Sequence, residues 1–196
     1  MYRFIETICI ENGVAQNLFR HELRLNATRR DFFGNLTDLH LKDYISPPQT
    51  GTERIRCRVT YAQDILSVEY FPYQARPVHT LKIIEDETTD YRYKYADRSA
   101  LDALFARRGT ADDILIVRNG FLTDTAIANI ALWDGFHWYT PAQPLLKGTR
   151  RAALLDAGIL TEQDIPALKI REYQKIRLFN AMLPFGEIEL PCTHIE

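Results

Sequence analysis

Alternating apolar and polar residues predict short strands in both halves of the chain. Residues 4–10 alternate and are rich in β-branched side chains, and Glu11-Asn12-Gly13 then supplies residues that tolerate a left-handed turn, so a hairpin is expected there. The same two-residue period predicts strands at 54–61 and 65–71. Further short strands are predicted at 78–84, 114–117, 126–133, 136–139, 168–170, 175–179 and 187–190.

Helical spacing of apolar residues predicts three main helices, at 18–33, 100–108 and 149–157. A shorter helix at 39–45 would end before Pro47, because a proline disfavours the helical conformation in the residue before it. Strands mixed with a few helices, without regular βαβ alternation, predict an α+β or mixed α/β fold rather than a doubly wound sheet.

A polar run at 85–90 has no apolar periodicity and marks the predicted boundary between two lobes. Residues 1–88 would form a smaller N-terminal α/β lobe, and residues 89–196 a larger C-terminal lobe. A chain of 196 residues can bury a substantial core and lies near the length at which one domain divides into two small ones.

Composition excludes several classes of partner. The net charge is −2, with 24 basic and 26 acidic residues interspersed, so neither nucleic acid nor a membrane surface is expected. No apolar run approaches the roughly 18 residues of a bilayer span, and no leader pattern is evident, so a cytoplasmic protein is predicted. The three cysteines are scattered singly and the histidines show no ligand spacing, so no metal site is predicted.

Lys94 is the first candidate catalytic residue. It lies in the aromatic stretch 91–95, where an amine could be shielded from water. Desolvation lowers the pKa of a lysine, which a Schiff-base or proton-transferring lysine requires. Taken alone, Lys94 would be interpreted as a solvated surface group, as most lysines of soluble proteins are.

Asp124 follows the Asn119-Gly120 turn and begins a segment that soon becomes wholly apolar. A carboxylate at the edge of a buried layer requires a cationic partner, and a protonated pyridine nitrogen is one. The alternative is a turn residue that bonds its own backbone.

Two further patterns suit the binding of an anion. Gly148-Thr149 opens a predicted helix, where unpaired amides and the helix dipole attract negative charge, although a plain capped helix has the same appearance. Arg24 lies with His21 and Glu22 on the polar side of the first helix. These three could form surface ion pairs, or Arg24 could turn inward and grip a phosphate with two hydrogen bonds.

In sequence order, these residues resemble the class IV aminotransferase family, the fold-type IV pyridoxal-phosphate enzymes. That family includes branched-chain and D-amino-acid aminotransferases and 4-amino-4-deoxychorismate lyase. The resemblance covers nearly the whole chain, through segments similar to F-E-T-I…G…H-x-x-R-L (4–25), K-x-x-N-R (94–98), T-E-x-x-x-x-N (123–129), T-P…L-x-G-x-x-R (140–151) and N-A-x-x-P (180–184). It implies a two-lobed, D-amino-acid aminotransferase-like fold, pyridoxal 5'-phosphate as cofactor, and a homodimer.

The resemblance also implies roles for individual residues. Lys94 would form the Schiff base and transfer the substrate proton, and Asp124 would hold the ring nitrogen. The phosphate would be bound by Arg24 and by amides of two short segments. Ile5 and Thr7 would line the substrate side, because alternate residues of a strand share one face. The amides are those around Gly148, Thr149, Asn180 and Ala181.

The chain departs from the family in two ways. Asp124 stands where most members have glutamate, one methylene longer, and the strands and G-D-G turn that precede F-E-T-I in the family are not found. The Asn180-Ala181 match favours a lyase that forms 4-aminobenzoate and pyruvate from an amino substrate. The alternatives are an aminotransferase for D- or branched-chain amino acids, or a pyridoxal-phosphate-binding relic without turnover.

Overall fold

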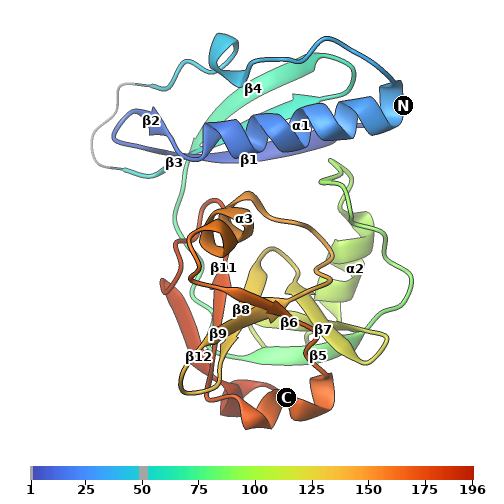
Figure 1. The fold of residues 1–196 in the computed structure, drawn as a ribbon, viewed down its shortest axis with the longest axis vertical. Coiled ribbons are helices and arrows are strands. Elements are labelled where there is room, and N and C mark those ends of the chain that lie inside the picture. Colours follow the sequence, from blue (N-terminus) through green and yellow to red (C-terminus); the bar gives the residue numbers. More distant parts are fainter. Residues whose placement is uncertain (1, 49–52) are drawn as a thin grey trace. The chain divides into compact units, whose positions relative to one another are not determined.

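A computed structural model describes residues 2–48 and 53–196, and within it the chain forms two compact units (Figure 1). Unit 1 comprises Met1–Ala75 and Tyr93–Asp97, and unit 2 comprises Arg76–Arg92 and Arg98–Glu196. These bounds differ from the predicted lobes, 1–88 and 89–196, because residues 93–97 return to unit 1. The return is held by a β-bridge between Tyr95 and Phe4.

Unit 1 contains an antiparallel sheet in the order β2-β1-β3-β4. Its strands are β1 (Phe4–Glu11), β2 (Val14–Ala15), β3 (Ile55–Tyr61) and β4 (Ile65–Pro72). The predicted hairpin is confirmed, because Asn12 and Gly13 between β1 and β2 both have positive φ, 52° and 74°.

Helix α1 (Leu18–Phe33) has the predicted bounds and lies across one face of this sheet (Figure 1). Alternate residues of β1 and β3 meet it in a buried core that includes Phe4, Ile8 and Leu25. Aromatic rings extend this core: the Phe4 ring lies 4.7 Å from that of Phe32 and 5.3 Å from that of Tyr95, between centroids.

The helix predicted at 39–45 is reduced to a single 3₁₀ turn, Leu41–Asp43. Side chains of α1 take the backbone groups that a longer helix would use. The Leu41 amide donates to the Glu22 carboxylate at 2.9 Å, and the Leu39 amide donates to Asn26 Oδ1 at 3.0 Å. Hydrogen bonds to side chains of α1 are therefore formed here in place of the backbone hydrogen bonds of a longer helix.

Unit 2 is built on a mixed sheet in the order β10-β9-β8-β7-β6-β5, with β11 pairing with both β8 and β12. The β5–β6 and β9–β10 pairs are parallel, and the other pairs are antiparallel. Its elements are β5 (Leu81–Glu85), α2 (Ser99–Ala106), β6 (Asp113–Arg118), β7 (Phe121–Thr125), β8 (Asn129–Trp133), β9 (Trp138–Pro141), α3 (Thr149–Asp156), β10 (Thr161–Gln163), β11 (Lys175–Phe179) and β12 (Ile188–Pro191). The mixed α+β prediction is confirmed.

Of the strand predictions in this unit, one began too early and another was wrong. The segment 126–133 is a turn followed by β8, because Thr125 Oγ1 accepts hydrogen bonds from the amides of Ile127 and Ala128 and closes a hairpin with β7. The segment 168–170 lies in a 3₁₀ helix, Ala167–Glu172. Its apparent alternation was misleading, since the Leu168 side chain is 98% exposed while Ile170 is buried.

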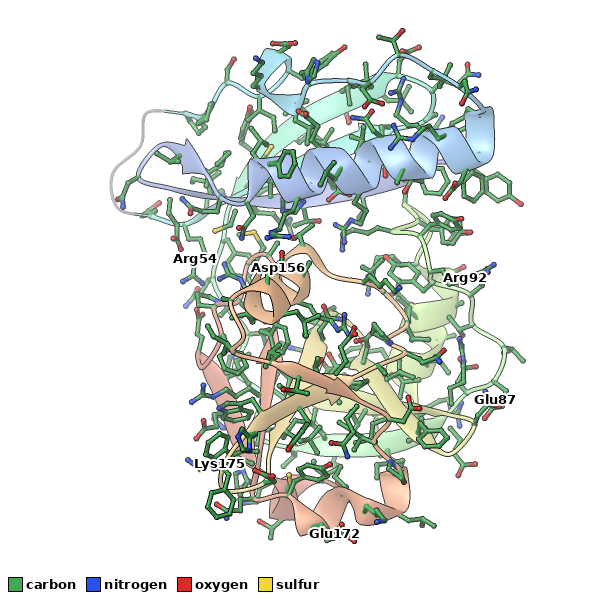
Figure 2. All side chains as sticks on the ribbon, in the orientation of Figure 1. Arg54, Glu87, Arg92, Asp156, Glu172 and Lys175 are labelled. Atoms are coloured by element: carbon green, nitrogen blue, oxygen red, sulfur yellow. The ribbon has the colours of Figure 1, made fainter. Side chains whose placement is uncertain are left out.

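The surfaces of the units carry ordinary ion pairs. In unit 1 Arg54 (labelled in Figure 2) bonds Glu11 at 3.0 Å, and in unit 2 Lys175 bonds Glu189 at 2.9 Å. Among the described residues, no helix is both long and apolar enough to cross a bilayer.

Candidate active site

The buried carboxylate of Glu6 organises one part of the candidate site within unit 1. Glu6 lies on the face of β1 that meets α1, between the inward positions of Phe4 and Ile8. Arg24 donates to it twice, from Nε to Oε1 at 2.8 Å and from a terminal nitrogen to Oε2 at 2.6 Å. His21 Nδ1 lies 2.6 Å from the same Oε2. Arg24 therefore turns inward, and its guanidinium is fixed by a two-point ion pair.

The charges in this cluster follow from its geometry. Burial alone would raise the pKa of Glu6, but the Arg24 charge and the hydrogen bonds from His21 and Arg24 hold that pKa at about 2. Burial lowers the pKa of His21 below its usual value, against the opposing hydrogen bond and charge of Glu6. The cluster is thus an ionised Glu6, a charged Arg24 and a neutral His21 at neutral pH.

Glu6 lies within the motif segment 4–25, but the motif implied no role for it. Its signal was a single carboxylate at an inward position of an otherwise apolar strand. Because buried charges are rarely left unpaired, such a residue predicts a cation on the element packed above it. Arg24 and His21 on α1 provide that partner set.

Lys94 is held at the edge of the same sheet by its backbone. The Ile5 amide donates to the Lys94 carbonyl at 2.9 Å, which places Lys94 opposite Ile5. Its neighbours Tyr93 and Tyr95 pack into the core beneath α1. Ile5 and Thr7 share the face of β1 that is turned away from α1, because side chains alternate along a strand. The backbone of Lys94 therefore lies beside Ile5, one of the two predicted substrate-side residues.

Asp124 in unit 2 is a buried strand residue rather than a turn residue. Its Oδ1 accepts a hydrogen bond from Asn129 Nδ2 at 2.7 Å, and its Oδ2 accepts one from the Leu146 amide at 2.9 Å. Burial raises the pKa of Asp124 to about 6, although the bonds from Leu146 and Asn129 and the Arg151 charge oppose the rise. No described residue forms an ion pair with this carboxylate within 4 Å.

Asn129 connects Asp124 to the start of α3. Its Nδ2 also donates to the Leu146 carbonyl at 2.8 Å, and the segment from Leu146 leads to Gly148, the N-cap of α3. Gly148 provides no side-chain cap for the helix. A Cβ added to Gly148 would overlap Asn129 Oδ1. Glycine is therefore required there by a close approach to Asn129.

We expect Gly148→Ala to lower the free energy of unfolding by about 1–3 kcal/mol. The added methyl group must displace the buried Asn129 side chain, whose amide nitrogen donates two hydrogen bonds. Chemical denaturation of the variant and the parent protein measures the change. The matched control is the same substitution in an Asn129→Ala background, where the obstacle is gone and the cost should largely disappear. An equal cost in both backgrounds would show that Asn129 is not what excludes a side chain.

The Asn180 side chain closes its own turn. Its Oδ1 accepts from the amides of Met182 at 2.8 Å and Leu183 at 2.9 Å, and its backbone amide donates to the Leu183 carbonyl at 3.2 Å. Its Nδ2 donates to the Ile127 carbonyl at 3.0 Å, which ties this turn to the β7–β8 hairpin. The backbone amide of Asn180 is thus already engaged.

The neighbouring Ala181 amide donates no hydrogen bond to the part of the chain that the structure describes. Arg150 fixes this turn from α3, donating to the Asn180 carbonyl at 2.7 Å and to the Ala181 carbonyl at 3.2 Å. Sequence reasoning missed Arg150 because its partners are backbone carbonyls thirty residues away. Unit 2 therefore brings together Asp124, the Gly148-Thr149 helix start and the Asn180-Ala181 turn.

Comparison with known proteins agrees with this fold. A family model described as amino-transferase class IV matches residues 3–189. An uncharacterized protein of Haemophilus influenzae is 37% identical over 185 residues, which are 93% of this chain and 98% of that protein. The chain therefore belongs to the class IV aminotransferases, a family of enzymes, as the resemblance implied.

Solved structures extend the comparison to the whole fold. A protein of Haemophilus somnus, provisionally named 4-amino-4-deoxychorismate lyase, has a TM-score of 0.86 and 32% identity, with 93% of this chain and 97% of that chain covered. A protein of Mesorhizobium loti, provisionally named an amino-acid aminotransferase, has a TM-score of 0.80 and 21% identity over all of both chains, which shows the fold alone. A Schizosaccharomyces pombe protein provisionally named aminodeoxychorismate lyase is 26% identical over 149 residues, which are 67% of this chain and 64% of that protein.

Proposed function

We propose that this chain is a pyridoxal-phosphate-dependent enzyme with the activity of a 4-amino-4-deoxychorismate lyase, which forms 4-aminobenzoate and pyruvate. The observation that supports the cofactor assignment is Asp124, a buried carboxylate that accepts hydrogen bonds only from neutral donors. Such a group is stabilised by a cation, and a protonated pyridine nitrogen is a cation of the right kind. The lyase activity is supported by the names of the Haemophilus somnus and Schizosaccharomyces pombe proteins.

The donors present also suit a phosphate. In unit 2 the start of α3 has no side-chain cap, and the Ala181 amide makes no bond with a described residue. Amides at a helix start bind phosphate through hydrogen bonds and the helix dipole. In unit 1 the Arg24 side chain is 17% exposed, and its guanidinium is oriented by Glu6. We assign phosphate binding to Arg24, to the amides of Gly148 and Thr149, and to the Ala181 amide, while Asn180 shapes its turn.

When bound, pyridoxal phosphate supplies an electron sink for the carbon that loses a proton. Lys94 would bind the cofactor aldehyde and then move that proton with its amine. Asp124, once ionised, would keep the ring nitrogen protonated, and Asn129 would hold the carboxylate in one orientation. Ile5 and Thr7, which share one face of β1, would contact the substrate.

An aminotransferase for D- or branched-chain amino acids is the second candidate, supported by the Mesorhizobium loti fold and its name. A pyridoxal-phosphate-binding relic without turnover is the third. We further propose a cytoplasmic homodimer. The exposed Phe19 and Leu23 support the dimer, because residues four apart lie on one side of a helix and apolar groups there favour a partner surface.

We expect the purified protein loaded with pyridoxal phosphate to convert 4-amino-4-deoxychorismate to 4-aminobenzoate and pyruvate, measured by chromatography of the products. D-alanine, L-alanine and a branched amino acid serve as controls that should leave the cofactor unchanged. If one of them instead yields pyridoxamine phosphate and no 4-aminobenzoate forms, the enzyme is an aminotransferase. Cofactor binding without any turnover would identify the relic, and no cofactor binding would refute the proposal.

A further inference from the structure

The face of the unit 1 sheet opposite α1 carries a row of polar side chains. Residues directly opposite each other on paired strands share a face, and the β1–β3 register sets Thr7 opposite Arg58. Alternation adds Ile5 to the same face of β1, and the Lys94 carbonyl accepts a hydrogen bond from the Ile5 amide. A hydroxyl and a guanidinium therefore occupy one face of two paired strands, and the backbone of Lys94 lies beside the first of them.

Arg58 is the residue of this row without a partner in the molecule. Its Nε is buried and has no hydrogen-bond partner, and no described residue forms a hydrogen bond or ion pair with its guanidinium. Glu69 is directly opposite Arg58 on β4, yet the two side chains are not paired. A buried N–H without a partner costs roughly 1–3 kcal/mol, so its retention requires an explanation.

Two neighbouring arginines differ from Arg58, because each guanidinium has an interaction partner. Arg54 bonds Glu11 at 3.0 Å, and the guanidinium of Arg56 lies 5.0 Å from the centre of the Phe71 ring. Arg56 is on the same strand and face as Arg58, two residues earlier, and is exposed. The lack of a hydrogen-bond partner for Arg58 Nε is therefore specific to its position and is not shared by these neighbouring arginines.

An anion from outside the chain could accept the hydrogen bonds that the Arg58 guanidinium does not donate to the described residues. The planar fork of a guanidinium matches a carboxylate through two parallel hydrogen bonds, and burial of Nε strengthens such a pair. Arg58 lies directly opposite Thr7, which with Ile5 would line the substrate side of the site.

We propose that Arg58 binds a carboxylate of the amino substrate and makes the enzyme selective for carboxylate-bearing amino compounds over simple amines. This inference rests on the proposed function, since it takes the substrate to lie against Ile5 and Thr7, beside the cofactor that Lys94 would hold. It names a specificity residue that the family motifs in this chain do not include.

The test uses enzyme loaded with pyridoxal phosphate and calorimetric titration of three probes. 4-Aminobenzoate and pyruvate carry a carboxylate, whereas aniline is 4-aminobenzoate without one. Arg58→Gln should weaken the binding of at least one carboxylate probe by about 10- to 100-fold and leave aniline unchanged. Arg58→Lys, which keeps the charge but not the fork, should give an intermediate loss, and Arg56→Gln is the matched control that should change nothing.

The outcomes separate the two levels of inference. If the parent protein shows no absorbance band of lysine-bound pyridoxal phosphate, the proposed function fails and this role falls with it. If the cofactor binds normally and Arg58→Gln binds both carboxylate probes as tightly as the parent protein does, only the role of Arg58 is overturned. An equal loss for aniline and 4-aminobenzoate would likewise overturn it, since the effect would not depend on the carboxylate.

Discussion

Lys94→Ala is expected to remove the long-wavelength absorbance of lysine-bound pyridoxal phosphate and to lower turnover by more than about 1,000-fold. The substitution removes both the amine that binds the cofactor and the base that moves the substrate proton. It should leave the fold intact, because Lys94 is held in the sheet through its backbone carbonyl, which accepts from the Ile5 amide at 2.9 Å. Absorbance titration and product formation measure the two losses.

Lys42→Ala is the matched control, since Lys42 is an exposed lysine of the same unit. A small amine added to Lys94→Ala should restore part of the turnover if the lost group acts as a base, whereas a merely structural lysine would not be replaced in this way. Unchanged absorbance in Lys94→Ala would show that another lysine binds the cofactor.

Glu6→Gln is expected to lower the free energy of unfolding by about 3 kcal/mol at pH 7, because it leaves the Arg24 charge next to a neutral group in a buried setting. Glutamine keeps the size of glutamate and changes only its charge. Glu11→Gln is the control on the same strand. Its carboxylate also pairs with an arginine, Arg54, but is 40% exposed, so the change should stay within about 1 kcal/mol.

The effect of Glu6→Gln should depend on pH in a defined direction. The pKa of Glu6 is about 2 in the folded protein, below its unfolded value of about 4.3, so its contribution is full above the unfolded value and is lost as the pH falls toward 2. The difference between parent and variant should shrink by about half between pH 5 and pH 3, as measured by urea unfolding. A difference that does not change with pH would show that the charge of Glu6 is not what stabilises the cluster.

His21 acts in the same direction over a higher range of pH. Because its folded pKa is lowered by burial, the unfolded chain binds a proton more readily below about 6.5, and acid therefore favours unfolding. The contribution of this cluster to stability therefore decreases as the pH falls below about 6.5.

The sequence predicted best those elements that depend on local pattern. The bounds of α1 were predicted correctly because its sixteen residues alternate between a core side and a polar side, and the first hairpin because Asn12-Gly13 is suited to positive φ. The β7–β8 hairpin was missed because Ala126 and Ala128 continue the apolar run while Thr125 makes the turn. A turn formed by a side chain within an apolar run has no signature in hydrophobic spacing.

The site shows the same division between local and distant information. The inward orientation of Arg24 was one of two alternatives from spacing, and only the buried Glu6, eighteen residues earlier, decides between them. The contact of Asn129 with Gly148 joins positions nineteen apart through a tight approach, and a list of residue types could not reveal it. Arg58 was not predicted because its significance is the lack of a partner among the described residues, which requires the three-dimensional structure.

The return of residues 93–97 to unit 1 limits how this protein could be divided or exchanged in parts. A fragment ending at Ala75 would keep Arg24 and Arg58 but lose Lys94, which the chain delivers only after entering unit 2. Neither unit is encoded by one continuous stretch of gene. A single crossover between relatives within residues 76–92 would take Lys94 and the strand that anchors it, β1, from different parents.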